Sequence, residues 1–407
     1  MRILAIHRYY WPDVAPYGVM LKALAAHWAS QGHSVSVSTA VPSYGAGKAK
    51  RTSVCESSHE GVAVRRIRIG SDQRSAFSRL VNAIAFSVIT AGQVALGRRR
   101  DLVMCSTVPQ VLLAYMVSLA CRLRRTRFLY HCMDLHPEIG AISGEFAAPW
   151  RYRFLMRLEK ATCRRAWAIV VLSEDMRLTL IQRDQRLAAK IHVIENFDLP
   201  PDVDQSDIAK PMPRPSPGVI RICFTGNLGR FQGLEQVVDV VLRGPAELDA
   251  LELVLMGDGA VADALRKRWR HAPVGVRSRL RFLPHSPRGE ALALMRSSDY
   301  GLVSLVPGVI RFAHPSKAAT YLAQGLPLLV AVEEDSELVR SVLHNGTGRH
   351  LPHEEGEMLA TLLDLTRLGP VSEAFRNKAL EYWSDHLEFG RVLVAWEELL
   401  TTAGGKS

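Results

Sequence analysis

The sequence predicts an α/β protein with two doubly wound, Rossmann-like domains, each built on a parallel sheet flanked by helices. Short apolar runs typical of strands alternate with helical stretches along most of the 407 residues. A proline-rich segment, 199–217, interrupts the alternation, and the same pattern then starts again. At about 100–200 residues per domain, the length suits two such units.

The first half opens with the order strand, helix, strand. Residues 2–7 form an apolar strand, a loop runs to Gly18, and a helical pattern over 19–32 leads to a strand at 33–40. This order is typical of a parallel sheet covered by helices. Further strands are predicted at 101–106, 127–134, 166–173 and 190–196.

The second half repeats this organisation. A helix is predicted at 233–243, another after His314, and the closing segment 373–400 is helical throughout. Doubly wound sheets bind ligands beyond the carboxyl ends of their strands, so we expect a cleft there, facing between the domains. We predict domains at 1–198 and 218–407, joined by the linker 199–217. The strands of this half are predicted at 219–227, 251–259, 279–285, 300–306 and 327–333.

The positive charge is concentrated in the first half of the chain. Residues 1–200 hold 28 Lys and Arg against 14 Asp and Glu, a net charge of +14, whereas the remainder has −3. A basic face can meet nucleic acid, a membrane surface or an acidic substrate. No nucleic-acid-binding signature is present, so we expect no nucleic acid partner.

The six cysteines form no C-x-x-C pair and no metal-like spacing. This pattern indicates reduced thiols in a cytosol. The first apolar run is too short for a signal peptide, and no carboxylate pair predicts a metal site. We therefore expect a cytoplasmic protein that needs no metal.

Three loops that follow predicted strands carry candidate ligand-binding residues. Glycine lets a backbone approach a ligand closely, and the amides of such turns can hold a diphosphate. A Ser-Lys pair at a helix start adds amides and a positive charge. The alternatives are structural turn glycines and an ordinary helix cap with a solvated lysine. The residues are Gly18, Gly226, Asn227, Gly257, Asp258, Ser316 and Lys317.

No G-x-G-x-x-G and no G-K-[ST] sequence accompanies these loops. Their absence argues against a dinucleotide-dependent dehydrogenase and a P-loop kinase.

Four polar residues cluster at the end of the strand 127–134. A carboxylate or imidazole here could orient an acceptor hydroxyl or accept its proton. The alternative is a capped strand end. The residues are His131, Asp134, His136 and Glu138.

In motif order and over nearly its whole length, the chain resembles the retaining glycosyltransferases of family 4, and within them the bacterial exopolysaccharide and O-antigen branch. The resemblance implies the GT-B fold, a nucleotide diphosphate sugar bound by the C-terminal domain, and metal-independent transfer with retention to a polyprenyl-linked glycan. It implies acceptor roles for His131, Asp134 and Glu138. The segments that carry it are HRYYWPDVAPYG, GHSVSVSTAVPSYG, DLHPEIGAISG, VVLSEDM, HVIENFD, FTGNLGRFQGLE, LMGDGA and HPSKAATYLAQGLP.

The sequence departs from this family at its usual glutamate pair, which falls on Phe312 and Thr320. Thr320 could still donate one hydrogen bond to a ribose hydroxyl. The usual basic pair of the first donor loop falls on Asn227 and Gln232, and Arg230 or Arg311 could supply the charge. Two alternatives stay open: a GT-B-fold sugar-nucleotide epimerase and a catalytically weakened GT-B partner protein.

Together with the net charge of +14 on residues 1–200, two features predict docking on an anionic membrane, peripherally and at its inner face. Residues 80–97 form an uncharged helix followed by three arginines, and polar groups on one face favour an interfacial or packed helix over a span. A basic stripe, with Phe154 expected to face away from it, suits anionic lipid. The stripe comprises Arg153, Arg157, Lys160 and Arg164, and Arg122, Arg124, Arg125 and Arg127 add to it.

Overall fold

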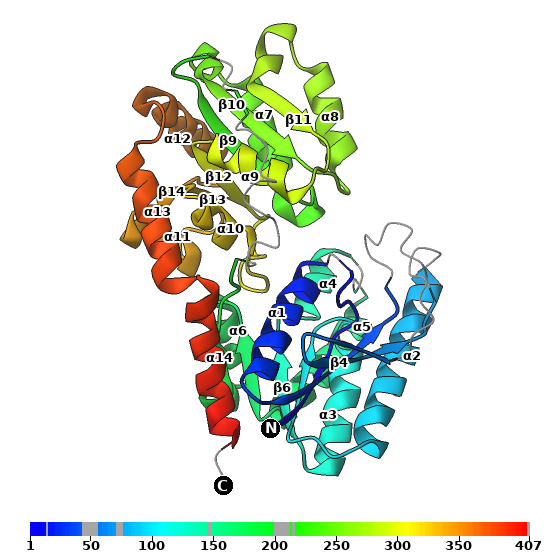
Figure 1. Ribbon diagram of the computed structural model, residues 1–407. Helices are drawn as coiled ribbons and strands as arrows, with labels where there is room; N and C mark the ends of the chain where they lie inside the picture. The colour runs from blue at the N-terminus through cyan, green and yellow to red at the C-terminus, as the bar shows by residue number, and fades with distance from the viewer. Residues whose placement is uncertain are drawn as a thin grey trace. The chain divides into compact units, whose positions relative to one another are not determined.

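The computed structural model describes residues 1–13, 15–42, 56–70, 76–144, 146, 148–198, 212–213 and 216–404. The chain forms two compact units. The first comprises Met1–Glu195 with Phe312–His314 and Leu393–Ser407, and the second comprises Asn196–Arg311 and Pro315–Val392. Each unit is a sheet with helices, which confirms the predicted α/β class (Figure 1).

The first unit contains an eight-stranded sheet in the order β3-β4-β2-β1-β5-β6-β7-β8. Every neighbouring pair is parallel except β3 and β4, an antiparallel hairpin at the edge that the sequence pattern did not predict. The strands are β1 (Arg2–Ile6), β2 (Ser34–Ala40), β3 (Glu56–His59), β4 (Val62–Ile67), β5 (Leu102–Ser106), β6 (Arg127–His131), β7 (Ala168–Val171) and β8 (Ile191–Val193).

Helices α2, α3 and α5 lie side by side in the first unit, with α3 in contact with both of the others (Figure 1). Their inner faces and the sheet enclose a core that includes Phe86, Val117 and Phe128. The helices are α1 (Pro16–Ser30), α2 (Ala76–Leu96), α3 (Leu112–Arg124), α4 (Glu138–Ile142), α5 (Pro149–Arg165) and α6 (Glu174–Arg183).

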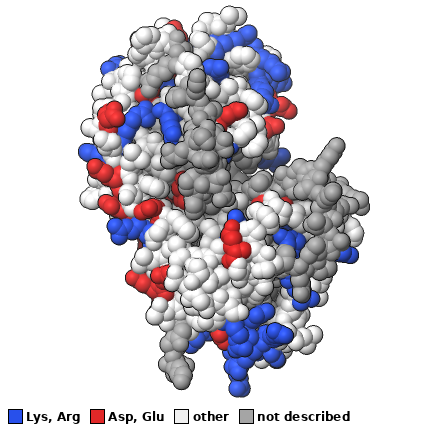
Figure 2. Space-filling view, in the orientation of Figure 1, with Lys and Arg blue, Asp and Glu red and all other residues white. Residues whose placement is uncertain are grey.

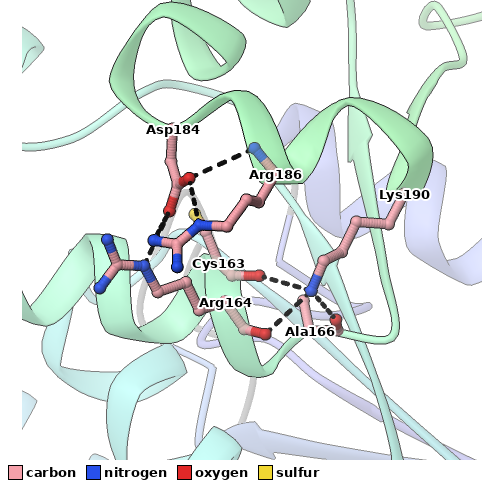
Figure 3. Close-up of polar contacts among 6 residues, drawn as sticks. All are labelled: Cys163, Arg164, Ala166, Asp184, Arg186 and Lys190. Atoms are coloured by element: carbon pink, nitrogen blue, oxygen red, sulfur yellow. Dashed lines mark hydrogen bonds and ion pairs between the residues drawn. The ribbon is translucent and has the colours of Figure 1, made fainter.

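The end of α5 is held by polar contacts (Figure 3). The Lys190 ammonium donates to the main-chain oxygens of Arg164 and Ala166, both at 2.8 Å, and so pairs carbonyls that the helix end leaves open. The Asp184 carboxylate accepts from Arg164 at 2.7 Å and from Arg186 at 2.9 Å. Arg164 is thus offset by an acid and contributes less to the predicted basic stripe.

The second unit contains a six-stranded parallel sheet in the order β11-β10-β9-β12-β13-β14. Numbered within the unit, this is the 3-2-1-4-5-6 order of a doubly wound nucleotide-binding fold. Strands β9 to β11 extend the sheet to one side and β12 to β14 extend it to the other, so the strand order reverses between β9 and β12. The strands are β9 (Ile220–Thr225), β10 (Leu251–Met256), β11 (Leu280–Leu283), β12 (Tyr300–Ser304), β13 (Leu328–Ala331) and β14 (Gly348–His350).

Helices of the second unit cover this sheet, and α7 packs its valines into the core. The closing segment predicted as continuous is two helices, because α13 ends at His386 and α14 starts at Phe389. The helices are α7 (Leu234–Arg243), α8 (Ala262–His271), α9 (Arg288–Arg296), α10 (Lys317–Ala323), α11 (Glu337–Asn345), α12 (Glu355–Leu368) and α13 (Glu373–His386). Helix α14 (Phe389–Gly404) begins in the second unit and belongs to the first from Leu393 onward.

Most of the predicted linker 199–217 lies outside the described residues. Its described part is anchored by buried Arg221, whose guanidinium donates to the main-chain oxygens of Met212 at 3.1 Å and Pro213 at 2.7 Å. The same guanidinium donates to Glu252 at 2.6 Å. The end of the linker therefore belongs to the second unit.

Candidate active site

Two loops of the second unit meet beside the point where the order of its strands reverses. They follow β9 and β10, and Gly226 N donates to Met256 O while Leu228 N donates to Asp258 O, both at 2.9 Å. A Cβ on Gly257 would stand 1.9 Å from Gly226 O, and its φ of +145° also requires glycine. Gly226 and Gly257 therefore allow the close approach of two loops at the ligand-binding end of the sheet.

Polar side chains of these loops remain exposed. Asn227 and Arg230 are exposed after β9, and Asp258 is exposed after β10, where its carboxylate accepts from Gly259 N at 2.9 Å. Asn227 lies over Gly259, because a Cβ there would meet its Oδ1 at 2.5 Å. The predicted donor residues Asn227 and Asp258 are thus brought together.

Lys317 lies at the first position of α10 and is directed to the loop after β9. Its ammonium donates to Gln232 Oε1 at 3.2 Å and stands 3.6 Å from the centre of the Phe224 ring. Burial lowers the pKa of this ammonium to about 7, because a partly apolar site disfavours the charged form. An anion beside Lys317 would favour its charged form and be held by it.

Tyr321 ties α10 to the end of β9, a role that the sequence interpretation missed. The Tyr321 hydroxyl accepts from Thr225 N at 3.0 Å, and a Cβ on Gly301 would stand 2.4 Å from the Tyr321 ring. Gly301 in the middle of a strand was the available signal, since such a glycine marks a close approach. The Tyr321 contact fixes the start of α10 relative to the glycine loops.

Thr320, at the position of a family glutamate, faces a carboxylate instead. Its hydroxyl donates to Asp198 Oδ1 at 3.0 Å, and Arg288 stands 3.4 Å from the same oxygen. The sequence interpretation did not name Asp198, which lies next to the predicted linker. The Thr320 hydroxyl is therefore already engaged, and the prediction that it contacts a ribose is untested.

Arg311 and Ser316 are both exposed in the second unit. Arg311 pairs with exposed Asp335 at 3.3 Å, so its charge is offset and it is a poor source of the missing donor-loop charge. Ser316 precedes α10, but its side chain forms no capping hydrogen bond to the helix. Arg230 is therefore the better candidate for the positive charge that the first donor loop lacks.

The acceptor candidates lie in the first unit, at the carboxyl ends of its central strands. His131 Nδ1 is 2.9 Å from the Tyr17 hydroxyl, and His7 Nδ1 is hydrogen-bonded to Ser106. Burial lowers the pKa of both imidazoles to about 3, with His131 adding to the shift of His7. Neutral His131 can orient a hydroxyl, but it is too weak a base for the predicted proton transfer at neutral pH.

Asp134 and Glu138 are in different surroundings. Burial raises the pKa of Asp134 to about 6, close to the range of a general base. Its backbone forms an antiparallel bridge with Ala313, and Phe312, at the other family glutamate position, packs against the core of this unit. Glu138 is largely buried and pairs with Arg183 at 2.5 Å, so its charge is already offset, and its catalytic role stays a prediction.

Gly18 is explained by packing. It is buried in α1, and a Cβ there would stand 3.0 Å from Tyr9 O and 3.4 Å from Tyr10 Cα. A methyl group would press on this loop backbone. The other donor candidates all lie in the second unit, whereas Gly18 lies in the first. Its contact with a donor stays a prediction.

Among the described residues, no group of three or more His, Cys, Asp or Glu side chains is arranged to hold a metal ion. The five described cysteines are buried free thiols. Cys55 lies outside the described residues. Cys132 and Cys163 are in the core of the first unit, where burial raises the pKa of each thiol. They therefore offer no reactive thiolate at neutral pH.

The structural comparisons give the fold, which is GT-B. The crystal structure of Anabaena Alr3699/HepE in complex with UDP covers 99% of this chain and 100% of its own, at 15% identity and a TM-score of 0.65. The structure of the same protein with UDP-glucose covers 99% of each chain, at 16% identity and a TM-score of 0.63.

The sequence comparisons identify a domain and its relatives. Residues 17–196 match the Glycosyl transferase 4-like domain. "Probable glycosyltransferase WbjE" of Pseudomonas aeruginosa is 27% identical over 344 residues, 80% of each chain. WcaI of Escherichia coli strain K12, named as a colanic acid biosynthesis glycosyl transferase, is 24% identical over 83% of this chain and 85% of its own. Residues 17–196 therefore carry a Glycosyl transferase 4-like domain, in a chain of the GT-B fold whose curated relatives are named as glycosyltransferases.

Proposed function

We propose that the protein transfers a sugar from a nucleotide diphosphate sugar to a lipid-linked glycan, with retention of configuration and without a metal ion, in the synthesis of a cell-surface polysaccharide. The polysaccharide assignment is supported by WcaI, named for colanic acid biosynthesis. The nucleotide donor is supported by HepE, whose structures contain UDP and UDP-glucose.

The observation that carries the proposal is the position of Lys317 beside Gln232 at the end of β9. A diphosphate bound at the turn after Gly226 would bring negative charge to this ammonium. As the sugar leaves, charge develops on the diphosphate, and a fixed cation stabilises that charge most. Lys317 and Arg230 therefore act on the leaving group.

On the acceptor side, Asp134 is the group we propose to accept or orient the hydroxyl proton. Its pKa of about 6 leaves the carboxylate ionised at neutral pH while it remains basic enough to share a proton. His131, fixed by Tyr17, orients the acceptor as a neutral hydrogen-bonding group. Asp134→Asn should therefore lower turnover while nucleotide binding is unchanged.

The direct test uses purified protein, a lipid extract as acceptor source, and a panel of uridine, guanosine and adenosine diphosphate sugars carrying labelled sugar. We expect label to enter the organic phase with one donor and to do so in the presence of a chelator. The anomeric configuration of the product is read by NMR. A product of inverted configuration, or transfer abolished by chelation, would contradict the corresponding part of the proposal.

Two results would identify the alternatives. Conversion of the nucleotide sugar into an isomer without any acceptor would indicate an epimerase. Absence of any nucleotide binding by calorimetry, in a folded protein, would indicate a GT-B partner that has lost the reaction. We further propose a cytoplasmic enzyme that acts peripherally at the inner face of the membrane, where a lipid-linked glycan would be presented.

A further inference from the structure

Helix α2 exposes a row of large apolar side chains, where a helix of a water-soluble domain usually carries polar ones. The side chains turned into the first unit include the fully buried hydroxyls of Ser87 and Thr90. The outer side carries large apolar residues, with Phe77 at 75% and Val88 at 50% exposure. At 100° per residue the outer positions span about 100°, a continuous stripe. This outer stripe consists of Phe77, Leu80, Val81, Ile84 and Val88.

The inner side of α2 is fixed to the fold. Asn82 exchanges two hydrogen bonds with the Gly70 backbone, at 3.1 Å and 2.9 Å, and Phe86 is fully buried in the core. Residues Phe77–Leu96 have the length and the mean hydropathy, 1.4, of a membrane-crossing helix. Crossing would break the Asn82 and Phe86 contacts, so the helix is better suited to lie on an apolar surface than to traverse one.

The apolar surface continues from α2 across the neighbouring helices. Leu119 and Leu123 are exposed on α3, and Trp150 and Phe154 on α5. Phe154 is 53% exposed, so it reaches the surface of α5 although it is offset around the helix from the basic stripe. Because α3 contacts both α2 and α5, these residues belong to one face of the first unit, here called the three-helix face.

The three-helix face is basic as well as apolar. Its only acid is Glu159, which is fully buried, because α2 and α3 contain no Asp or Glu. Figure 2 shows Lys and Arg gathered at the lower edge of the first unit, toward the ends of α2 and α3. Exposed arginines border the face at Arg79, Arg98, Arg99, Arg122, Arg125, Arg151, Arg153 and Arg157.

We infer that the three-helix face docks on an anionic lipid bilayer, with α2 lying in the plane of the interface and its outer stripe in the acyl boundary. The inference rests on the peripheral location proposed above and names the residues that produce it. Apolar side chains bordered by arginines match an anionic interface. A second copy of the chain is a poorer occupant, because pairing two such faces would bring arginines together.

The test is flotation of the full chain with vesicles of phosphatidylcholine alone and of phosphatidylcholine mixed with phosphatidylglycerol, at low and high salt. We expect binding to the anionic vesicles only, weakened by salt and fully released by carbonate. Ile84→Glu combined with Val88→Glu should lower the bound fraction at least about tenfold. Val274→Glu with Leu343→Glu, at exposed apolar positions of the second unit, should leave it unchanged.

Charge is tested separately. Arg98→Glu with Arg99→Glu should reduce binding to anionic vesicles, whereas Lys267→Glu with Arg270→Glu on α8 makes the same charge change and should have little effect. No vesicle binding by the wild type, or equal binding by all variants, would overturn the inference. So would a dimer in sedimentation that Ile84→Glu with Val88→Glu converts to monomer. The vesicles contain no glycan and no donor, so this outcome is independent of the proposed transfer reaction.

Discussion

The Lys317 ammonium stands 3.2 Å from the Gln232 amide oxygen and 3.6 Å from the centre of the Phe224 ring. These partners are neutral, so neither supplies a negative charge to the lysine. A cation held this way at the ligand-binding end of a doubly wound sheet is available to an anionic ligand. Four of the predictions below concern this half of the molecule.

The first prediction is that Lys317→Met weakens binding of nucleoside diphosphate about tenfold or more. A hydrogen bond to a charged group typically contributes about 1.5–3 kcal/mol, and methionine keeps the apolar contact with Phe224 while removing the charge. Calorimetry with the preferred nucleotide measures the change. Lys267→Met, at an exposed lysine of α8, is the control and should bind normally. Equal affinity in both variants would refute the role of Lys317.

The second prediction concerns pH. The pKa of free Lys317 is about 7, and a bound diphosphate should raise it because the anion favours the ammonium form. Binding therefore takes up a proton between pH 7 and the higher pKa of the complex. Affinity should fall as pH rises through that window, by at most tenfold per unit.

The measurement for this second prediction is calorimetry at pH 7 to 9 in buffers of different ionisation enthalpy. Proton uptake should be present in the wild type and absent in Lys317→Met, which also controls for titration of the nucleotide itself. The same uptake in the variant would assign the proton to another group.

The sequence predicts the sheets better than the contacts that complete the site. Buried parallel strands read as apolar runs, so β9, β10 and β12 are evident from the residue pattern alone. The hairpin β3–β4 is not, because a short polar edge strand such as Glu56–His59 carries little hydrophobic signal. Glycines such as Gly257 were identifiable because tight loops after strands require them.

Side-chain partners from distant positions were not predictable. Asp198 meets Thr320 across 122 positions, and Glu138 meets Arg183 across 45, so neither pairing follows from local spacing. The pKa of His131 likewise depends on burial by the folded unit. Residue type alone therefore groups His131, Asp134 and Glu138 as catalytic candidates. Only the contacts of each side chain in the folded unit show that their surroundings differ.

The third prediction is that Thr320→Glu destabilises the second unit. The sequence alone favours tolerance, since glutamate is usual in the family. The structure places Asp198 Oδ1 at 3.0 Å from the Thr320 hydroxyl, so a glutamate would bring a second carboxylate beside the first. We expect a loss of about 1 kcal/mol or more in the free energy of unfolding.

Adding Asp198→Asn to Thr320→Glu should recover much of this loss. The coupling between the two changes is obtained from a double-mutant cycle in urea denaturation. Additive effects would mean that the two side chains do not interact.

The fourth prediction is that Gly257→Ala disrupts the nucleotide loops. Its φ of +145° costs roughly 1–3 kcal/mol for a residue with a Cβ, and the methyl would overlap Gly226 O. Both stability and nucleotide binding should fall. Gly275→Ala, where nothing lies within 4 Å of a new Cβ, is the matched control and should behave as wild type in thermal melting and calorimetry.

The fifth prediction concerns buried Glu159, whose carboxylate accepts from the Tyr130 hydroxyl at 2.9 Å. Burial raises the pKa of this carboxyl from 4.5 to about 7, and Arg183 opposes the shift. The folded protein therefore binds a proton that the unfolded chain releases above pH 4.5, so this group makes folding less favourable as pH rises from about 4.5 to 7. At 1.36 kcal/mol per pH unit, the contribution of Glu159 across that window is about 3 kcal/mol.

Glu159→Gln keeps a neutral polar group beside Tyr130 and should remove this pH dependence. The stability of the variant relative to wild type should therefore increase between pH 5 and 8. Urea unfolding at both pH values measures the difference, with Glu174→Gln on α6, at a partly exposed carboxylate, as the control. A difference between Glu159→Gln and wild type that does not change with pH would mean that the buried carboxyl stays ionised, as a strong pairing with Arg183 would require.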